Sequence, residues 1–245
     1  MRIKVLGINA SPRKYGGTAK LLHLALEAAR REGAETEFIH LYDHEIKPCL
    51  GCLSDVQGAC RPPCVINDDM RILYDKVLGA DGIIIATPVY WYGPSGHLKN
   101  FIDRLTAFEN MALLGDKSWV EGKVAGAIAV GADSGEIMAI SYILSTLNSM
   151  GMLVPPWALA YTKLSTNALE DRNAAMDAAN VGLIVARTAK LVKYHGPSQW
   201  YEPQLSWLDD YARQLEAEMG RLANQELSER RKLWEKLVRG RLKHG

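Results

Sequence analysis

The sequence predicts an α/β fold in which five parallel strands form a doubly wound sheet and a C-terminal helical extension follows. Short apolar runs alternate along the chain with longer segments whose apolar residues recur at helical spacing. Two of these runs, 81–87 and 123–131, are apolar through their centres, which is typical of strands buried on both faces of a parallel sheet. The alternation stops near residue 196. We therefore expect one α/β domain over residues 1–195 and a helical extension over residues 196–245.

The first half of the predicted domain begins with a strand at 2–8, a glycine-containing loop and a helix at 18–32. A second strand is expected at 34–42, where apolar and polar residues alternate. Residues 43–67 contain three prolines and all four cysteines, so we expect no regular element there beyond a turn or two. This irregular segment separates the second strand from the next helix.

The second half continues the alternation of helices and strands. The expected elements are a helix that follows the capping acids Asp68 and Asp69 and ends near residue 78, a strand at 81–87, a helix at 97–108, a strand at 123–131, a helix at 135–152, a strand at 153–161 and a helix at 171–194. The fifth strand is the weakest of them because it contains two prolines. In the extension, 204–243 should form one or two amphipathic helices that pack against a neighbouring subunit.

Composition and charge favour a protein that acts on small molecules. The chain has 245 residues, of which 48% are hydrophobic and 23% charged, and its net charge of +1 provides no broad positive field for nucleic acid. No apolar run approaches the roughly 18 residues that a membrane span needs, and the N-terminal apolar run is too short for a secretion signal. We therefore expect a cytoplasmic protein with no membrane or nucleic-acid partner.

Residues 9–20, NASPRKYGGTAK, join the first strand to the first helix and contain three cations, two adjacent glycines and no acid. A helix N-terminus with glycines before it favours an anion, and Ser11, Arg13 and Thr18 could add donors. Neither a Walker loop nor GxGxxG is present, so a terminal monophosphate fits better than ATP or a dinucleotide. The alternative is a solvated turn in which Thr18 only caps the helix.

Residues 86–104, ATPVYWYGPSGHLKNFIDR, follow the third strand and contain the aromatic run Tyr90, Trp91 and Tyr92. Because the carboxyl ends of parallel strands meet at one edge of a sheet, this loop should lie near the first one. Aromatic side chains at that edge suit a planar ligand. The alternative is that they belong to the core or to a subunit contact.

Together, SPRKYGGT and TPVYWYGPSGHLKNFIDR resemble the flavodoxin-like NAD(P)H-dependent FMN reductases, and KPCLGC with CVINDDM resembles the iron-sulfur flavoprotein branch of that family. The resemblance covers about residues 1–195. It implies a flavodoxin-like fold, FMN as cofactor, NAD(P)H as electron donor, and a homodimer or homotetramer. The residues that it assigns to FMN are Ser11, Arg13, Gly17 and Thr18 at the phosphate, Pro88, Val89, Tyr90, Trp91, Tyr92 and Gly93 at the ring, and Gly131, Asp133 and Gly135 in a loop that closes over the ring.

All four cysteines, Cys49, Cys52, Cys60 and Cys64, lie within 16 residues. Four clustered thiols suit tetrahedral zinc or a [4Fe–4S] cluster. The iron-sulfur flavoproteins use a tighter C-x2-C-x2-C spacing, whose third position is Asp55 in this sequence, so Cys60 would have to replace it as a ligand. Three alternatives therefore stay open: a cluster, zinc, and reduced thiols without a metal.

These features support two functions and one non-catalytic alternative. In the first, NAD(P)H reduces bound FMN, which passes electrons to a quinone, a nitro or azo compound, or a flavin. The flavin carries this chemistry, so no catalytic side chain is predicted. In the second, a cluster relays electrons between a protein partner and FMN. The third is a flavodoxin-like binding or regulatory module.

Four further polar residues are expected to have ordinary structural roles. His23 and His97 lie in predicted helices and should pack there rather than act as bases. Asp103 and Arg104 should form an exposed ion pair, which stabilises a protein by ~1 kcal/mol at most.

Overall fold

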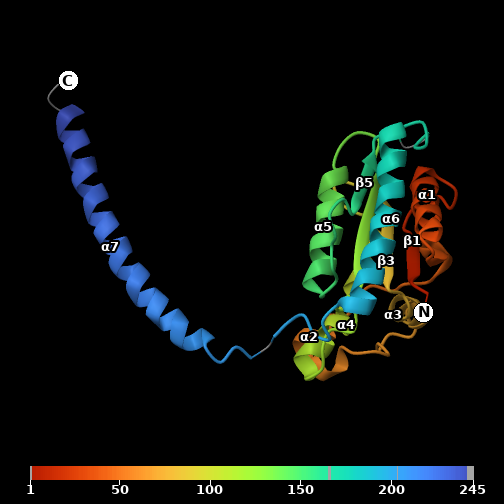
Figure 1. Cartoon of the computed structure of the whole chain (residues 1–245), viewed down its shortest axis with the longest axis horizontal. Helices are drawn as coiled ribbons and strands as arrows, with labels where there is room; N and C mark the ends of the chain where they lie inside the picture. The colour runs from red at the N-terminus through yellow and green to blue at the C-terminus, as the bar shows by residue number, and fades with distance from the viewer. Residues whose placement is uncertain (1, 165–166, 203, 242–245) are drawn as a thin grey trace. The chain divides into compact units, whose positions relative to one another are not determined.

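The computed structural model describes residues 2–164, 167–202 and 204–241, and the chain divides into two compact units, Met1–Trp200 and Tyr201–Gly245. The first unit is built on one five-stranded sheet (Figure 1). Its strands are β1 (Lys4–Asn9), β2 (Glu35–His40), β3 (Gly82–Pro88), β4 (Val124–Val130) and β5 (Leu159–Thr162). They lie in the order β2-β1-β3-β4-β5 and every pairing is parallel. The predicted α/β class with a doubly wound parallel sheet is confirmed.

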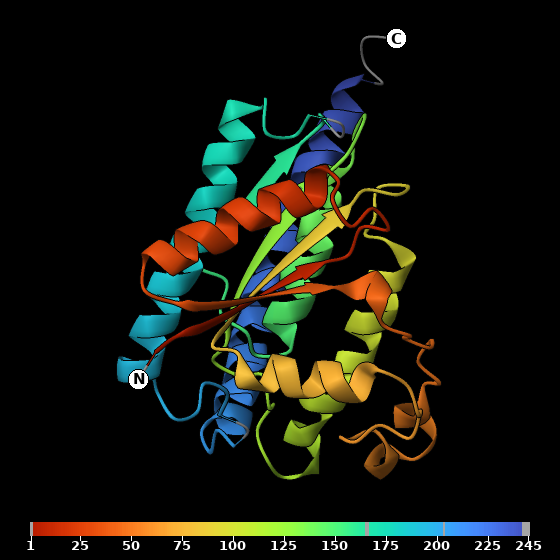
Figure 2. The ribbon, with the colours of Figure 1, turned by 90° about the vertical axis from the view of Figure 1, so that its right-hand side faces the viewer.

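Helices cover both faces of the sheet (Figures 1 and 2). They are α1 (Gly17–Arg31), α3 (Met70–Gly79), α4 (Gly96–Glu109), α5 (Glu136–Ser149) and α6 (Arg172–His195). Buried side chains of α1 and α6 share one core cluster, and those of α3, α4 and α5 share the other. The predicted domain boundary at 195/196 lies where α6 ends.

The central strands bury side chains on both of their faces. Along β3, Ile83 and Ile85 pack in the cluster that contains α4 and α5, while Ile84 packs in the cluster of α1 and α6. All seven residues of β4 are buried, as expected for a strand with helices above and below it. This burial explains why both strands appear in the sequence as continuous apolar runs.

Several predicted elements have different bounds in the structure. The fifth strand begins at Leu159 and not at residue 153. Leu153 forms only an isolated bridge with Val124, because Pro155, Pro156 and the left-handed Trp157, with φ of 63°, interrupt the pairing after it. The first helix begins at Gly17, so Thr18 lies inside its first turn and Gly16 is the N-cap residue. The 3₁₀ turn η1 (Leu41–Asp43) leads into the irregular segment, which contains the four-residue helix α2 (Cys52–Asp55) and a second 3₁₀ turn, η2 (Gln57–Ala59).

The prediction of an exposed ion pair between Asp103 and Arg104 is wrong. Arg104 is 2% exposed and pairs with Asp68, whereas Asp103 pairs with Lys99 on the surface of α4. Asp68 does accept the N–H of Met70 at the start of α3, as a capping acid should, but it also has this second, buried partner. The pair is 36 residues apart in sequence, so helix spacing alone could not reveal it.

Both histidines have the packing roles that the sequence predicts. The His23 ring stacks on Phe38 with ring centroids 4.5 Å apart. Nε2 of His97 lies 3.0 Å from the carbonyl oxygen of Leu41 and 3.1 Å from that of His44. Each ring therefore helps to hold a helix against β2 or the turn that follows it.

The described part of the second unit contains one long helix. This helix, α7, spans Leu208–Arg241, where one or two amphipathic helices were expected. No described helix is both long enough and apolar enough to cross a membrane. The proposed packing of its leucine stripe on another subunit stays a prediction.

Candidate functional site

A pocket of about 110 Å³ opens where β1, β3 and β4 end. Because β1 lies between β2 and β3, successive strands are added on opposite sides of it, and ligands of doubly wound folds bind at such a reversal. The residues that line the pocket are Ser11, Arg13, Gly16, Gly17, Thr18, Pro88, Val89, Tyr90, Val130, Gly131 and Ala132. The structure thus brings together eight of the thirteen residues assigned to FMN. Four belong to the loop after β1 (the first loop), three to the loop after β3 (the second loop) and one to the loop after β4 (the third loop).

The first loop presents hydrogen-bond donors at the start of α1. Its N-cap residue, Gly16, offers no side-chain acceptor to the first turn, and this turn contains no acid. The buried hydroxyls of Ser11 and Thr18 lie beside it. Arg13 forms no ion pair with any described residue, while Lys14 pairs with Asp43. Uncapped helix N–H groups, hydroxyls and an unpaired cation together suit an anion.

Ser95, which the sequence analysis missed, ties the first loop to the second. Its hydroxyl donates to the carbonyl oxygen of Ala10 at 2.8 Å and accepts the N–H of Leu98 as the N-cap of α4. Its own N–H donates to the Thr87 hydroxyl at 3.1 Å. The serine two residues before HLK in the sequence is a recognisable helix start. Its bond to the first loop depends on the fold and could not be predicted.

The aromatic run forms a tight turn at the pocket rim. Tyr90 and Gly93 exchange two backbone hydrogen bonds of 2.9 and 3.0 Å, and the residues between them, Trp91 and Tyr92, have φ of 50° and 65°. Bulky residues at positive φ are uncommon and strained, and such strain concentrates at functional sites. Trp91 is 96% exposed. Of these four residues only Tyr90 lines the pocket.

The third loop contacts the second through glycines. A Cβ added at Gly135, which has φ of 100°, would lie 2.8 Å from Cα of Tyr92. Gly131 lines the pocket, but Asp133 and Gly135 do not. Glu136 is 3% exposed, and its Oε1 lies 2.0 Å from the place where a Cβ of Gly131 would be. Sequence analysis missed this carboxyl, whose Oε1 has no hydrogen-bond partner among the described residues.

The four cysteines lie outside this pocket, in the segment around α2. Cys49 is exposed, Cys60 is buried, and all four are free thiols. Burial, followed by the neighbouring thiols of Cys52 and Cys49, raises the pKa of Cys60 to about 11. The thiols are therefore near one another. Within the described ranges, however, no three histidine, cysteine or acidic side chains are arranged as a metal site requires.

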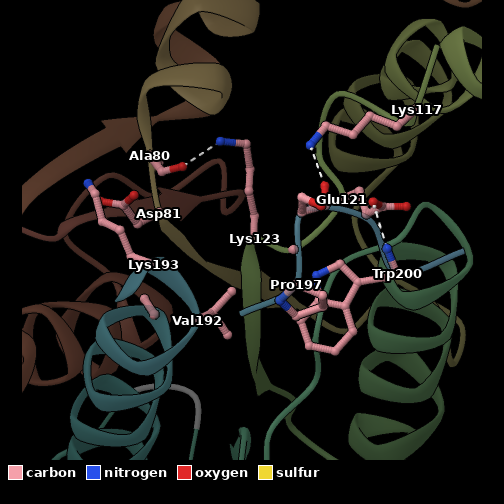
Figure 3. Close-up of a pocket in the computed structure, with 12 residues that line it drawn as sticks. Ala80, Asp81, Lys117, Glu121, Lys123, Val192, Lys193, Pro197 and Trp200 are labelled. Carbon is pink, nitrogen blue, oxygen red and sulfur yellow. Dashed lines mark hydrogen bonds and ion pairs between the residues drawn. The ribbon is translucent and has the colours of Figure 1, made fainter. Parts of the chain in front are cut away.

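A second pocket, of about 200 Å³, lies at the opposite edge of the sheet, where β3 and β4 begin (Figure 3). Its cations already have partners. Lys123 Nζ donates to the carbonyl oxygens of Leu78 and Ala80 at 2.8 and 2.6 Å, and Lys193 pairs with Asp81 at 2.9 Å. Lys123 thus satisfies carbonyl oxygens at the end of α3. The lysines of this pocket therefore have structural roles, and we do not assign a ligand to it.

Lys123 gives the protein a specific pH dependence of stability. Burial lowers its pKa from 10.5 to about 8, so the unfolded chain binds more protons than the folded one between these values. The free energy of unfolding should therefore rise with pH in this window, by on the order of 2 kcal/mol. Urea unfolding at pH 7.5, 8.5 and 9.5 should show this rise in the wild type and in Lys117→Met, and a smaller rise in Lys123→Met. Equal slopes in all three proteins would contradict the assignment.

A family model and several known proteins are similar to this chain in sequence. The family model for NADPH-dependent FMN reductase matches residues 3–164. The chain is 36% identical over 203 residues to an iron-sulfur flavoprotein of Methanocaldococcus jannaschii, covering 78% of this chain and all of that protein. It is 31% identical to a Bacillus subtilis protein named as an NAD(P)H-dependent FMN-containing oxidoreductase, covering 73% and 96% of the two chains.

Solved structures show the same fold at lower sequence identity. RosB, whose crystal structure contains 8-demethyl-8-formylriboflavin-5'-phosphate, superposes with a TM-score of 0.67 at 20% identity, covering 88% of this chain and 87% of that one. A flavodoxin from the Archaea has a TM-score of 0.51 at 16% identity, over 77% and 99% of the two chains. The predicted flavodoxin-like fold is therefore confirmed.

Proposed function

Because the chain belongs to the NADPH-dependent FMN reductase family, in its iron-sulfur flavoprotein branch, we propose that it binds FMN in the pocket at the ends of β1, β3 and β4. We further propose that NAD(P)H reduces this FMN and that a second acceptor removes the electrons. The protein is an oxidoreductase of this family; its acceptor and its site residues are our inference. The observation that carries the proposal is one pocket with an anion-binding helix start on one side and an apolar loop on another.

FMN fits the chemistry of this pocket. Gly16 and Gly17 let a phosphate approach the first turn of α1, and Arg13 and Thr18 can donate to it. Pro88 and Val89 offer an apolar wall for a flavin ring. These groups bind and orient; hydride and electron transfer are chemistry that bound FMN itself supplies.

The exposed aromatic turn supports a flavin ring with one face open to the electron donor and acceptor. Trp91 is almost fully exposed beside the pocket, and Tyr92 is 51% exposed. Nicotinamide and aromatic acceptors are planar, and aromatic side chains favour stacked contacts with such rings. We therefore propose that donor and acceptor take turns at this rim, and that the acceptor is a quinone, a nitro or azo compound, or a flavin.

Anaerobic reduction tests this function. Flavin-free full-length protein is loaded with FMN, and NADPH or NADH is added while flavin absorbance is recorded. We expect the flavin bands to bleach, and parallel lines in double-reciprocal plots of steady-state rates with a quinone. Bound FMN that neither nucleotide reduces would refute the reductase, and intersecting lines would refute alternate binding of donor and acceptor.

A relay through an iron-sulfur cluster is the second candidate. In its favour, four free thiols lie near one another, and donors of this kind bind iron-sulfur clusters. The donor set fits such a group, although the described side chains do not converge on one centre. Iron near four atoms per chain in anaerobically purified protein would favour the relay, zinc would favour a structural site, and neither metal would leave the thiols free.

We also propose that the chain assembles into a homodimer or homotetramer. The edge strand β5 exposes Leu159 and Tyr161, and Trp157 just before it is 81% exposed. Exposed apolar side chains gathered at a sheet edge favour a subunit contact. Light scattering of the full chain would show a single species of two or four subunits if this is right.

A further inference from the structure

One buried side chain closes the base of the cysteine segment, which we define as residues 47–68. Arg104 of α4 donates from Nη1 to the carbonyl oxygen of Lys47 at 3.1 Å and to Oδ2 of Asp68 at 2.7 Å. Its Nη2 donates to Oδ1 of Asp68 at 3.1 Å, and Oδ2 of Asp68 also accepts the N–H of Lys47 at 2.9 Å. A single guanidinium therefore joins the residue that begins the cysteine segment to the residue that ends it.

The middle of the cysteine segment is held from the same end of α4. Asn110, which directly follows α4 and is fully buried, donates from Nδ2 to the carbonyl oxygens of Gln57 at 3.0 Å and Cys60 at 2.7 Å. The Tyr74 hydroxyl of α3 donates to the carbonyl oxygen of Arg104 at 2.8 Å, which fixes the helix turn that carries the guanidinium. The cysteine segment thus has two anchor points on one rigid element.

Stability alone is a weak explanation for the buried pair. The side chains of Arg104 and Asp68 are 1% and 0% exposed. Removing two such charges from water costs about as much as their attraction returns, and apolar residues at such sites are often equally stable. A guanidinium, however, has N–H groups in a rigid fork, so it imposes the relative position of the groups it binds. The pair is better explained by the position that it gives the cysteine segment.

Arg104 also has a donor that its protein partners do not use. Its buried Nε–H has no acceptor among the residues that the structure describes. An unsatisfied buried donor is costly, so the burial of this guanidinium is again poorly explained by stability alone.

We propose that Arg104 is a positioning residue for the four cysteines: it holds both ends of the cysteine segment on α4. The purpose of this arrangement, the ordering of metal-binding thiolates, rests on the cluster function proposed above. The arrangement itself belongs to the polypeptide and can be measured in protein without iron.

The test compares the full-length variants Arg104→Gln and Arg104→Lys with the wild type, and Lys99→Met serves as control because it alters an exposed residue of the same helix. In iron-free, FMN-loaded protein, the rate at which iodoacetamide alkylates the buried Cys60 is resolved by peptide mass spectrometry. We expect a rate at least tenfold higher in Arg104→Gln, partial rescue in Arg104→Lys and no change in Lys99→Met. After anaerobic reconstitution, the ratio of iron to FMN should fall several-fold in Arg104→Gln, fall less in Arg104→Lys and stay unchanged in Lys99→Met.

FMN content reports whether each variant is folded, and where Arg104→Gln binds no FMN the comparison passes to Arg104→Lys. Wild-type alkylation of Cys60 in a folded Arg104 variant would overturn the proposal, as would an equal increase in Lys99→Met. If the wild type takes up no iron, the cluster function fails while the alkylation rates still decide the role of Arg104. If the wild type takes up iron and the Arg104 variants match it, the positioning role fails and the cluster function stands.

Discussion

The double variant Arg13→Ala, Thr18→Ala is expected to bind FMN at least about 100-fold more weakly than the wild type. Both side chains line the pocket at the start of α1, and each can donate a hydrogen bond to a charged phosphate. Such charged hydrogen bonds contribute roughly 1.5–3 kcal/mol each. Losing two of them therefore weakens FMN binding by about 3 kcal/mol or more, which corresponds to a Kd at least about 100-fold higher. Fluorescence titration of flavin-free protein measures the effect directly.

The matched control for this variant is Lys14→Ala. Lys14 is a cation of the same loop, but it pairs with Asp43 and does not line the pocket. It should keep nearly wild-type FMN affinity, while the double variant should keep the wild-type circular dichroism spectrum. Full FMN occupancy in a folded double variant would show that the loop does not hold the phosphate.

Gly182→Ala is expected to destabilise the first unit by about 3 kcal/mol. A Cβ at Gly182 of α6 would lie 1.8 Å from the carbonyl oxygen of Ala25 and 2.8 Å from its Cα, both backbone atoms of α1. Side-chain rotation cannot relieve a clash with backbone, so α1 and α6 would have to separate, and overpacking of this kind costs 1–3 kcal/mol or more. Urea unfolding would measure the loss.

Gly96→Ala provides the control for the glycine substitution. Gly96 is also helical, at the start of α4, but a Cβ there would meet no atom within 4 Å. Its stability should stay within roughly 0.5 kcal/mol of the wild type. Because α1 also carries Gly17 and Thr18, Gly182→Ala should weaken FMN binding as well. Equal stability of the two variants would contradict the close approach of the helices.

Much of the fold could be predicted because the decisive signals are local in sequence. The apolar runs at 81–87 and 123–131 correspond to strands β3 and β4, and helical spacing predicted α1 and α6 within a few residues. The fifth strand was misplaced because an apolar run predicts burial but not where pairing begins. Leu153 pairs with Val124, but Pro155 and Pro156 interrupt the pairing, which resumes as a strand only at Leu159.

The parts of the site that sequence analysis missed depend on contacts between distant residues. The partner of Arg104 is 36 residues away, and Ser95 reaches Ala10 across 85 residues. Glu136 lies in the first turn of α5, where acids are common, yet its side chain is buried beside Gly131. No periodicity or motif contains this information, because only the three-dimensional fold creates these contacts.

The aromatic run shows a different limit. Its position after the third strand predicted a place at the carboxyl edge of the sheet, which the structure bears out, but not that two bulky residues would occupy a two-residue turn at positive φ. Glycine and asparagine are the usual residues in such turns. Nothing in the aromatic run itself indicates that Tyr90 lines the pocket while Trp91 does not.

We propose that the start of α1 holds the phosphate of FMN while the loops after β3 and β4 hold its ring. A titration of flavin-free, full-length protein with FMN and with riboflavin tests this most directly, because the two ligands differ only in the phosphate. We expect FMN to bind at least about 100-fold more tightly than riboflavin, as the loss of several charged hydrogen bonds requires. Equal affinities would contradict a phosphate site at the start of α1, and no binding of either flavin would contradict the FMN site as a whole.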